Sequence, residues 1–173
     1  PVSGYRLRTD FKISCPQRSN PRVLPVDSEP SSISMQQLFT GKTRLAGYNE
    51  PWSYKKMGEI GVTFSGLTGK TKEDFGSGNA KYITFLNVLN NPILSPVMFD
   101  AVAIKDGEHQ NKCHKGDLFF NTSSETPEEV GICSMLDVEV ESLYLNSFCF
   151  GFRLTDANVT PKYLAYYFRS NEG

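Results

Sequence analysis

The sequence is poor in the residues that most often carry acid–base, nucleophilic or metal chemistry. It has two histidines and four cysteines among 173 residues, and His109 and His114 lie in one polar stretch. It contains no GxSxG nucleophile elbow and no CxxC or HxxxH pair, so neither a serine hydrolase nor a zinc site is indicated. We therefore expect a chain without catalytic activity, cofactor or bound metal.

The sequence also lacks an excess of charge of either sign. Lysine and arginine number 18 and aspartate and glutamate 19, which gives a net charge of −1. A protein that binds nucleic acid by itself is usually basic, so this balance argues mildly against that class. A local basic patch is still expected around Lys70, Lys72, Lys81, Lys112 and Lys115.

No apolar run approaches the roughly 20 residues that cross a bilayer, and no signal-peptide pattern opens the sequence. The cysteines are far apart, and Cys133 and Cys149 lie in apolar segments, which favours buried reduced thiols over a disulfide framework. We expect a cytoplasmic protein with no membrane partner. The composition, 39% apolar and 12% aromatic, is that of a globular domain.

The pattern along the chain changes twice. Residues 1–33 contain five prolines and no period of 2 or 3.6, which predicts an irregular N-terminal arm or linker. In residues 34–60, Ser34 can cap a short helix over 35–39 that ends at Gly41. Residues 61–173 then read as short strands and turns.

Within 61–173 strands are expected near 99–104, 117–121 and 130–136, with a buried strand or a strand-to-helix start near 82–89 and a strand pair or one bent strand at 141–154. Gly151 is expected to form a bulge in the last of these, and Pro161 to occupy the first position of a closing helix. The fold class predicted is α+β, with a twisted, mostly antiparallel sheet and flanking short helices.

One polar stretch follows a buried strand in "GDLFFNTSSETPEEVG". Asn121, Thr122, Ser123 and Ser124 come directly after the apolar residues. Neutral amide and hydroxyl groups are those that contact base edges and phosphates, so these four are candidate DNA-binding residues. The alternative is that Asn121 and Ser124 only cap turns.

Two further groups are candidates for the same role. "GLTGKT" falls two residues short of a P-loop, which makes nucleotide binding improbable, but Lys70, Thr71 and Lys72 can contact phosphates, with Lys81 beside them. A plain turn is the alternative. Asn87 is the third candidate, and turn capping is the alternative for it.

Two stretches resemble a known family. "MQQLFTGKTRL" at 35–45 and "WSYKKMGE" at 52–59 resemble the junction, at the end of a helical spacer, in specificity subunits of type I restriction–modification systems. The stretches "GLTGKTKEDFGSGNAKYITFLNVLNN" and "KGDLFFNTSSETPEEVG" are similar to a target recognition domain of that family, and the likeness covers about residues 35–170.

The resemblance implies domain bounds and a function. Residues 34–60 would be the end of the spacer and the junction, and 61–173 the target recognition domain. The family reads double-stranded DNA and directs adenine methylation by methyltransferase (M) subunits and, through them, restriction by the R subunit. Those partners would supply much of the phosphate binding, so a near-neutral domain can still specify sequence.

The chain departs from the family at both ends. Residues 1–33 do not resemble its first domain or spacer, and the family's domain is expected to continue past Gly173. A fragment or a degenerate copy is therefore expected. The alternative function is a truncated module that binds protein or a small ligand without DNA specificity.

Overall fold

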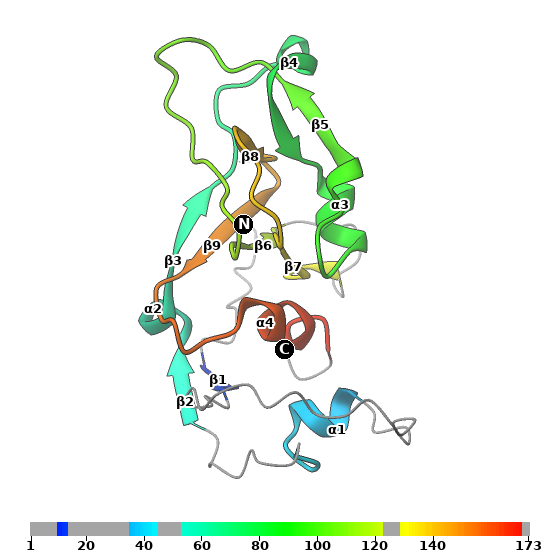
Figure 1. The fold of residues 1–173 in the computed structure, drawn as a ribbon, viewed down its shortest axis with the longest axis vertical. Helices are drawn as coiled ribbons and strands as arrows, with labels where there is room; N and C mark the ends of the chain where they lie inside the picture. Colours follow the sequence, from blue (N-terminus) through cyan, green and yellow to red (C-terminus); the bar gives the residue numbers. More distant parts are fainter. Residues whose placement is uncertain (1–9, 14–34, 45–52, 123–128, 171–173) are drawn as a thin grey trace, which may run out of the picture.

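The computed structural model describes residues 10–13, 35–44, 53–122 and 129–170, and short strands carry most of its fold (Figure 1). The described strands are β1 Asp10–Ile13, β2 Ser53–Lys56, β3 Gly61–Ser65, β4 Phe75–Ile83, β5 Phe99–Val102, β6 Leu118–Asn121, β7 Cys133–Met135, β8 Leu143–Leu145 and β9 Cys149–Leu154. The described helices are α1 Met35–Phe39, α2 Met57–Ile60, α3 Phe85–Asn90 and α4 Pro161–Tyr167, with 3-10 turns η1 Lys72–Asp74 and η2 Pro96–Met98.

The strands form three sheets. The central sheet has the order β3-β9-β6-β7, the upper sheet β5-β4-β8, and β1 pairs with β2 alone. Every pair of described strands is antiparallel except β4 with β8. This confirms the α+β class with mostly antiparallel sheets and short helices. The strands nevertheless divide among separate sheets, where the sequence predicted one.

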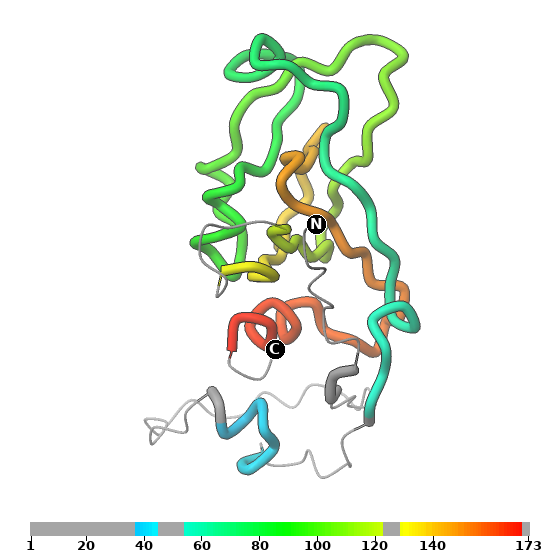
Figure 2. Tube along the Cα trace, turned by 180° about the vertical axis from the view of Figure 1, so that it is seen from behind, coloured from blue at the N-terminus to red at the C-terminus, as the bar shows by residue number. Residues whose placement is uncertain are grey.

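The central sheet has a hydrophobic cluster on each of its faces. Successive side chains of a strand point to opposite faces, so Leu118 and Phe120 join the cluster that includes Leu164 of α4. Phe119, between them, joins a second cluster with Val88 of α3 and Leu143 of β8. Figure 2 shows α4 passing below the sheet when the molecule is seen from behind. Strand β6 is thus buried on both sides.

Gly151 lies in regular strand pairing, so the predicted bulge is wrong. It stands opposite Phe64 on β3 and Phe119 on β6, with no shift of register in either pair. A Cβ atom at this position would lie 2.1–2.5 Å from ring atoms of Phe64. The glycine therefore makes room for the Phe64 ring to lie across β9.

The helix predicted at the junction is present as α1, and Gly41 follows it with a φ of 71°. Ser34, its predicted cap, lies outside the described residues. The Phe39 ring packs edge-on against Tyr163 and Tyr167 of α4, with centroids 5.5 and 5.8 Å away. The junction is therefore joined to the closing helix, which begins at Pro161 as predicted.

Residues 1–33 were predicted to be irregular, but the described part, Asp10–Ile13, forms β1 and pairs with β2. Cys113, Cys133 and Cys149 are free and buried, as predicted, and Cys15 lies outside the described residues. In the part of the chain that the structure describes, every helix is too short or too polar to cross a bilayer.

Candidate nucleic-acid interface

Two polar loops lie together at the upper end of the molecule in Figure 1, beside the antiparallel strands β4 and β5. The Thr68 N–H donates to Gln110 Oε1 at 3.1 Å, and Gln110 Nε2 donates to the Thr68 carbonyl at 2.8 Å. Asn79 Nδ2 donates to the Ile104 carbonyl at 3.0 Å, and the Ile104 N–H donates back to Asn79 Oδ1 at 2.9 Å. Each amide side chain thus pairs with one backbone N–H and one backbone carbonyl, as a neighbouring strand would.

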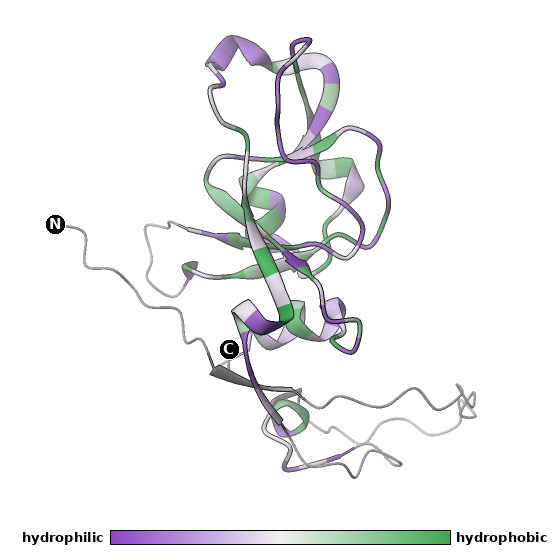
Figure 3. Cartoon of the chain, turned by 90° about the vertical axis from the view of Figure 1, so that its left-hand side faces the viewer, coloured by the Kyte–Doolittle hydropathy of each residue, from purple (hydrophilic) through white to green (hydrophobic). Residues whose placement is uncertain are grey.

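We call this region the polar platform and define it as the loops 66–71 and 103–112 together with η1 and residues 75–81 of β4. In Figure 3 the loop and the short helical turn at this end are drawn mostly in hydrophilic colours. Its apolar support is small and consists of Leu67, Ala80, Val102 and Tyr144, with a few half-buried neighbours.

Lys70 points inward and ties the two loops to each other. Its Nζ donates to the Ala103 carbonyl and to Glu108 Oε2, both at 2.6 Å, and only 5% of the side chain is exposed. The hydrogen bond from Lys70, with further ones from the Lys105 N–H and Gln110, lowers the pKa of Glu108 to about 2. Lys70 thus has a structural role here, and its phosphate contact stays a prediction.

Thr71 and Lys72, the other two candidates of this loop, differ from each other in their contacts. The Thr71 N–H and Oγ1 both donate to Asp74 Oδ2, at 2.9 and 3.1 Å, which closes the turn of η1. The backbone hydrogen bond from Thr71 is the main reason that the pKa of Asp74 is lowered. Lys72 begins this turn and is exposed, so it can reach a ligand without breaking an ion pair to any residue that the structure describes.

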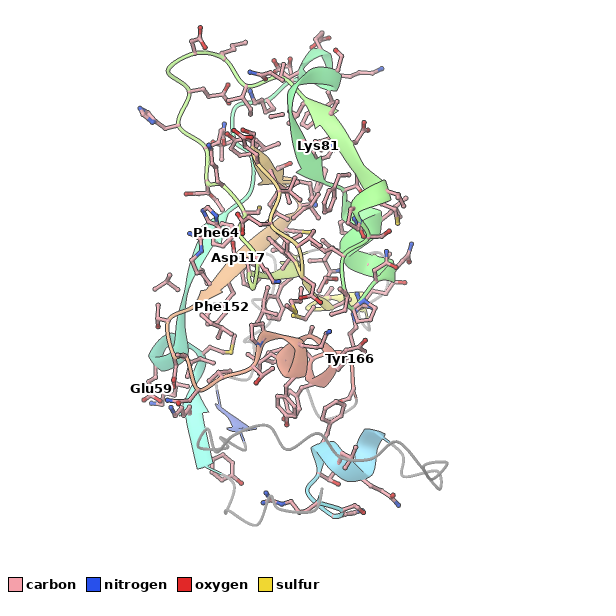
Figure 4. The ribbon with its side chains drawn as sticks, viewed as in Figure 1. Glu59, Phe64, Lys81, Asp117, Phe152 and Tyr166 are labelled. Carbon is pink, nitrogen blue, oxygen red and sulfur yellow. The ribbon has the colours of Figure 1, made fainter. Side chains whose placement is uncertain are left out.

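Lys81 is exposed on β4, opposite Ala101 of β5 and Leu143 of β8 (Figure 4). Among the residues that the structure describes, neither Lys72 nor Lys81 has a carboxylate within ion-pair distance. The structure therefore brings these two lysines to one end of the molecule with their charges available.

Asn87 is completely buried. Its Nδ2 donates to the Ser95 carbonyl at 2.9 Å, and its Oδ1 accepts from the Ser95 N–H and from Asn91 Nδ2, both at 3.0 Å. The side chain thereby fastens α3 to the segment before η2. This is the turn-capping alternative, and it leaves no polar atom of Asn87 facing outward.

The first two residues of the polar stretch at the end of β6 differ in exposure. Asn121 is 1% exposed and donates from Nδ2 to the Glu129 carbonyl. Thr122 is exposed, and its N–H and Oγ1 both donate to the Phe148 carbonyl, at 3.1 and 2.9 Å. Ser123 and Ser124 lie outside the described residues. Within this stretch, Thr122 is the described candidate that reaches the surface.

Sequence reasoning missed the groups that hold this region together. Gln110, Asn79 and Glu108 were not singled out, because each makes its contact with a residue at least 25 positions away. No local pattern encodes such a contact.

Groups suited to metal or thiol chemistry are not assembled in the described part of the chain. No three His, Cys, Asp or Glu side chains there could hold a metal ion. Burial raises the pKa of the Cys149 thiol to about 11, so this thiol is protonated at neutral pH.

Comparisons of the sequence with models of protein families and with curated proteins gave no match. The function is therefore inferred from the residues and their geometry.

Proposed function

We propose that this chain is a target recognition module of a type I restriction–modification specificity subunit. It reads double-stranded DNA and directs adenine methylation by M subunits and, through them, cleavage by the R subunit. The observation that carries the proposal is the sequence of residues 35–59, which resembles the family's junction between helical spacer and recognition domain. In this role the chain itself is not a catalyst.

The packing of α1 agrees with such a junction. A spacer that ends in a recognition domain must hold that domain at a fixed angle to the partner subunits, because the bases read and the adenine modified are part of one site. The contacts of Phe39 with Tyr163 and Tyr167 provide a rigid attachment of this kind.

The polar platform agrees with a DNA-facing end. Lys72 and Lys81 are exposed and unpaired among the described residues, and the loops around them are fixed by amide side chains and by the Lys70–Glu108 ion pair. A contact surface that is rigid before binding loses little entropy when it docks. In this proposal Lys72 and Lys81 contact phosphates, whereas Lys70, Asn87 and Asn121 support the surface from inside.

The proposal is tested with the chain assembled with a matching M subunit. Adenines methylated by the complex are mapped, and DNA affinity is measured against salt concentration. We expect one sequence to be modified selectively. Lys72→Ala and Lys81→Ala should each reduce the slope of log affinity against log salt by about 1, without changing which sequence is modified.

Lys162→Ala is the matched control. Lys162 is an exposed lysine on α4, away from the platform, and its only described ion pair is with Asp137 at 3.3 Å. It should leave the slope unchanged. A parent complex that binds without sequence preference would refute the recognition role, and equal slopes for all three lysine variants would refute the assignment of the platform.

A further inference from the structure

Phe148 is a large apolar side chain held out into solvent by a fully hydrogen-bonded backbone. The residue is 62% exposed to solvent. Its N–H donates to Asn146 Oδ1 at 2.8 Å, and its carbonyl accepts the two hydrogen bonds from Thr122. The turn between β8 and β9 is therefore attached at this residue to the end of β6.

The same turn is attached to β4. Asn146 is 6% exposed, and both its backbone N–H and its Nδ2 donate to the Ile83 carbonyl, at 3.2 and 3.1 Å. Phe148 thus projects from a site that two strands of different sheets hold in place. Single exposed apolar residues are ordinary on protein surfaces. Here the fixed backbone and the position beside Thr122, where the polar stretch begins, are the informative features.

Phe148 also lies a short length of chain from the strand that pairs with Lys81. Strand β8 runs parallel to β4, with Leu143 opposite Lys81. From Leu143 to Phe148 the chain can span at most about 18 Å. One turn of duplex DNA is roughly 34 Å long, so a single helical turn can cover both residues.

We propose that Phe148, together with the methyl group of Thr122, contacts the 5-methyl group of a thymine in the major groove. This rests on the proposed function and adds a residue that helps to set the sequence read. The thymine methyl is the apolar group on the major-groove edges, and phenylalanine and threonine methyl groups are suited to contact it. The Thr122 hydroxyl is engaged with the Phe148 carbonyl, which leaves the methyl group for such a contact.

The test uses the complex with the M subunit and a duplex whose sequence is selected from a randomised pool by binding. Each thymine in the half-site is replaced in turn by deoxyuridine, which removes only the methyl group. The parent should lose about 3- to 10-fold in affinity at one thymine, as expected for one buried methyl group. Phe148→Ala should lose most of this discrimination, because only the methyl group of Thr122 remains to contact the thymine.

Val97→Ala is the matched control, because Val97 is 91% exposed on η2 and outside the proposed contact. It should keep the full discrimination. Two results overturn the proposal: a selected half-site without thymine, or a Phe148→Ala complex that discriminates between the thymine and deoxyuridine duplexes as fully as the parent does. Failure of the parent to select any sequence overturns the recognition role as well, which separates the two failures.

Discussion

The central sheet and the polar platform are held together by different forces. The central sheet buries apolar side chains on both faces of β6, between α4 on one side and α3 and β8 on the other. The platform has only a small apolar cluster and relies on amide–backbone hydrogen bonds and on one largely buried ion pair. Stability is therefore concentrated away from the platform, and platform residues can vary with little risk to the fold.

The largest expected effect is in the central sheet. Phe119 is completely buried and packs edge-on against Phe64, with centroids 6.4 Å apart. Phe119→Ala should lower the free energy of unfolding by about 3–5 kcal/mol, because it removes apolar contacts and leaves a cavity. Urea unfolding followed by circular dichroism measures the loss.

Phe148→Ala is the control for this prediction, since it removes the same side chain from an exposed site. It should change the free energy of unfolding by no more than about 0.5 kcal/mol. Comparable losses in the two variants would show that the core does not carry the stability as described.

A smaller effect is expected where Arg169, just after α4, contacts α3 and β7. The Arg169 guanidinium donates from Nε to the Cys133 carbonyl at 2.6 Å and from Nη1 to the Leu89 carbonyl at 3.1 Å, and from Nη2 to Ser134 Oγ at 3.1 Å and to the Val88 carbonyl. Arg169→Lys keeps the charge but cannot reach all of these acceptors at once. It should cost about 1–3 kcal/mol in the same unfolding measurement.

The Arg169→Lys result is compared with Lys162→Arg on the exposed side of α4, where an equally conservative change should cost close to nothing. If Arg169→Lys is as harmless as Lys162→Arg, the carbonyl contacts do not hold the helix in place.

The smallest effect is expected in the platform, and it depends on pH. The pKa of Glu108 lies below its usual value of 4.5, at about 2. Its interaction with Lys70 therefore stabilises the fold above about pH 4.5, and this contribution is lost as the pH falls towards about 2. Glu108→Gln should lower Tm by a few degrees or less at pH 7, and parent and variant should converge in acid.

Thermal unfolding at pH 7 and near pH 3 measures this difference, and amide hydrogen exchange locates it in the loops 66–71 and 103–112. Glu141→Gln, an exposed glutamate without a described ion pair, is the control. A difference between parent and Glu108→Gln that stays constant with pH would exclude the ion pair as its cause.

Local patterns were sufficient to predict much of the fold. The helix before Gly41, the helix begun by Pro161 and the strands around Phe119 and Phe152 follow from caps, proline and apolar runs. The parallel pairing of β4 with β8 could not be predicted, because about 60 residues separate the two strands and parallel pairing has no local signal.

The candidate site was harder to predict than the fold. A polar residue at the end of an apolar strand reads as exposed, yet Asn121 stands opposite Cys149 in a strand that is buried throughout. Lys70 likewise reads as a free charge until its partner Glu108, in a different loop, is known. In both cases the burial depends on long-range packing, and single-sequence patterns carry no information about it.

The position of β9 between β3 and β6 has a consequence for synthesis on the ribosome. Cys149–Leu154 is translated after both of its neighbours. Until then, the edges of β3 and β6 that pair with β9 have no partner strand. At typical elongation rates, the interval between Asn121 and Leu154 is roughly 2–7 s. During that time the nascent chain exposes unpaired backbone N–H and C=O groups, which can pair with other chains. A chaperone that shields these groups should raise the yield of folded protein.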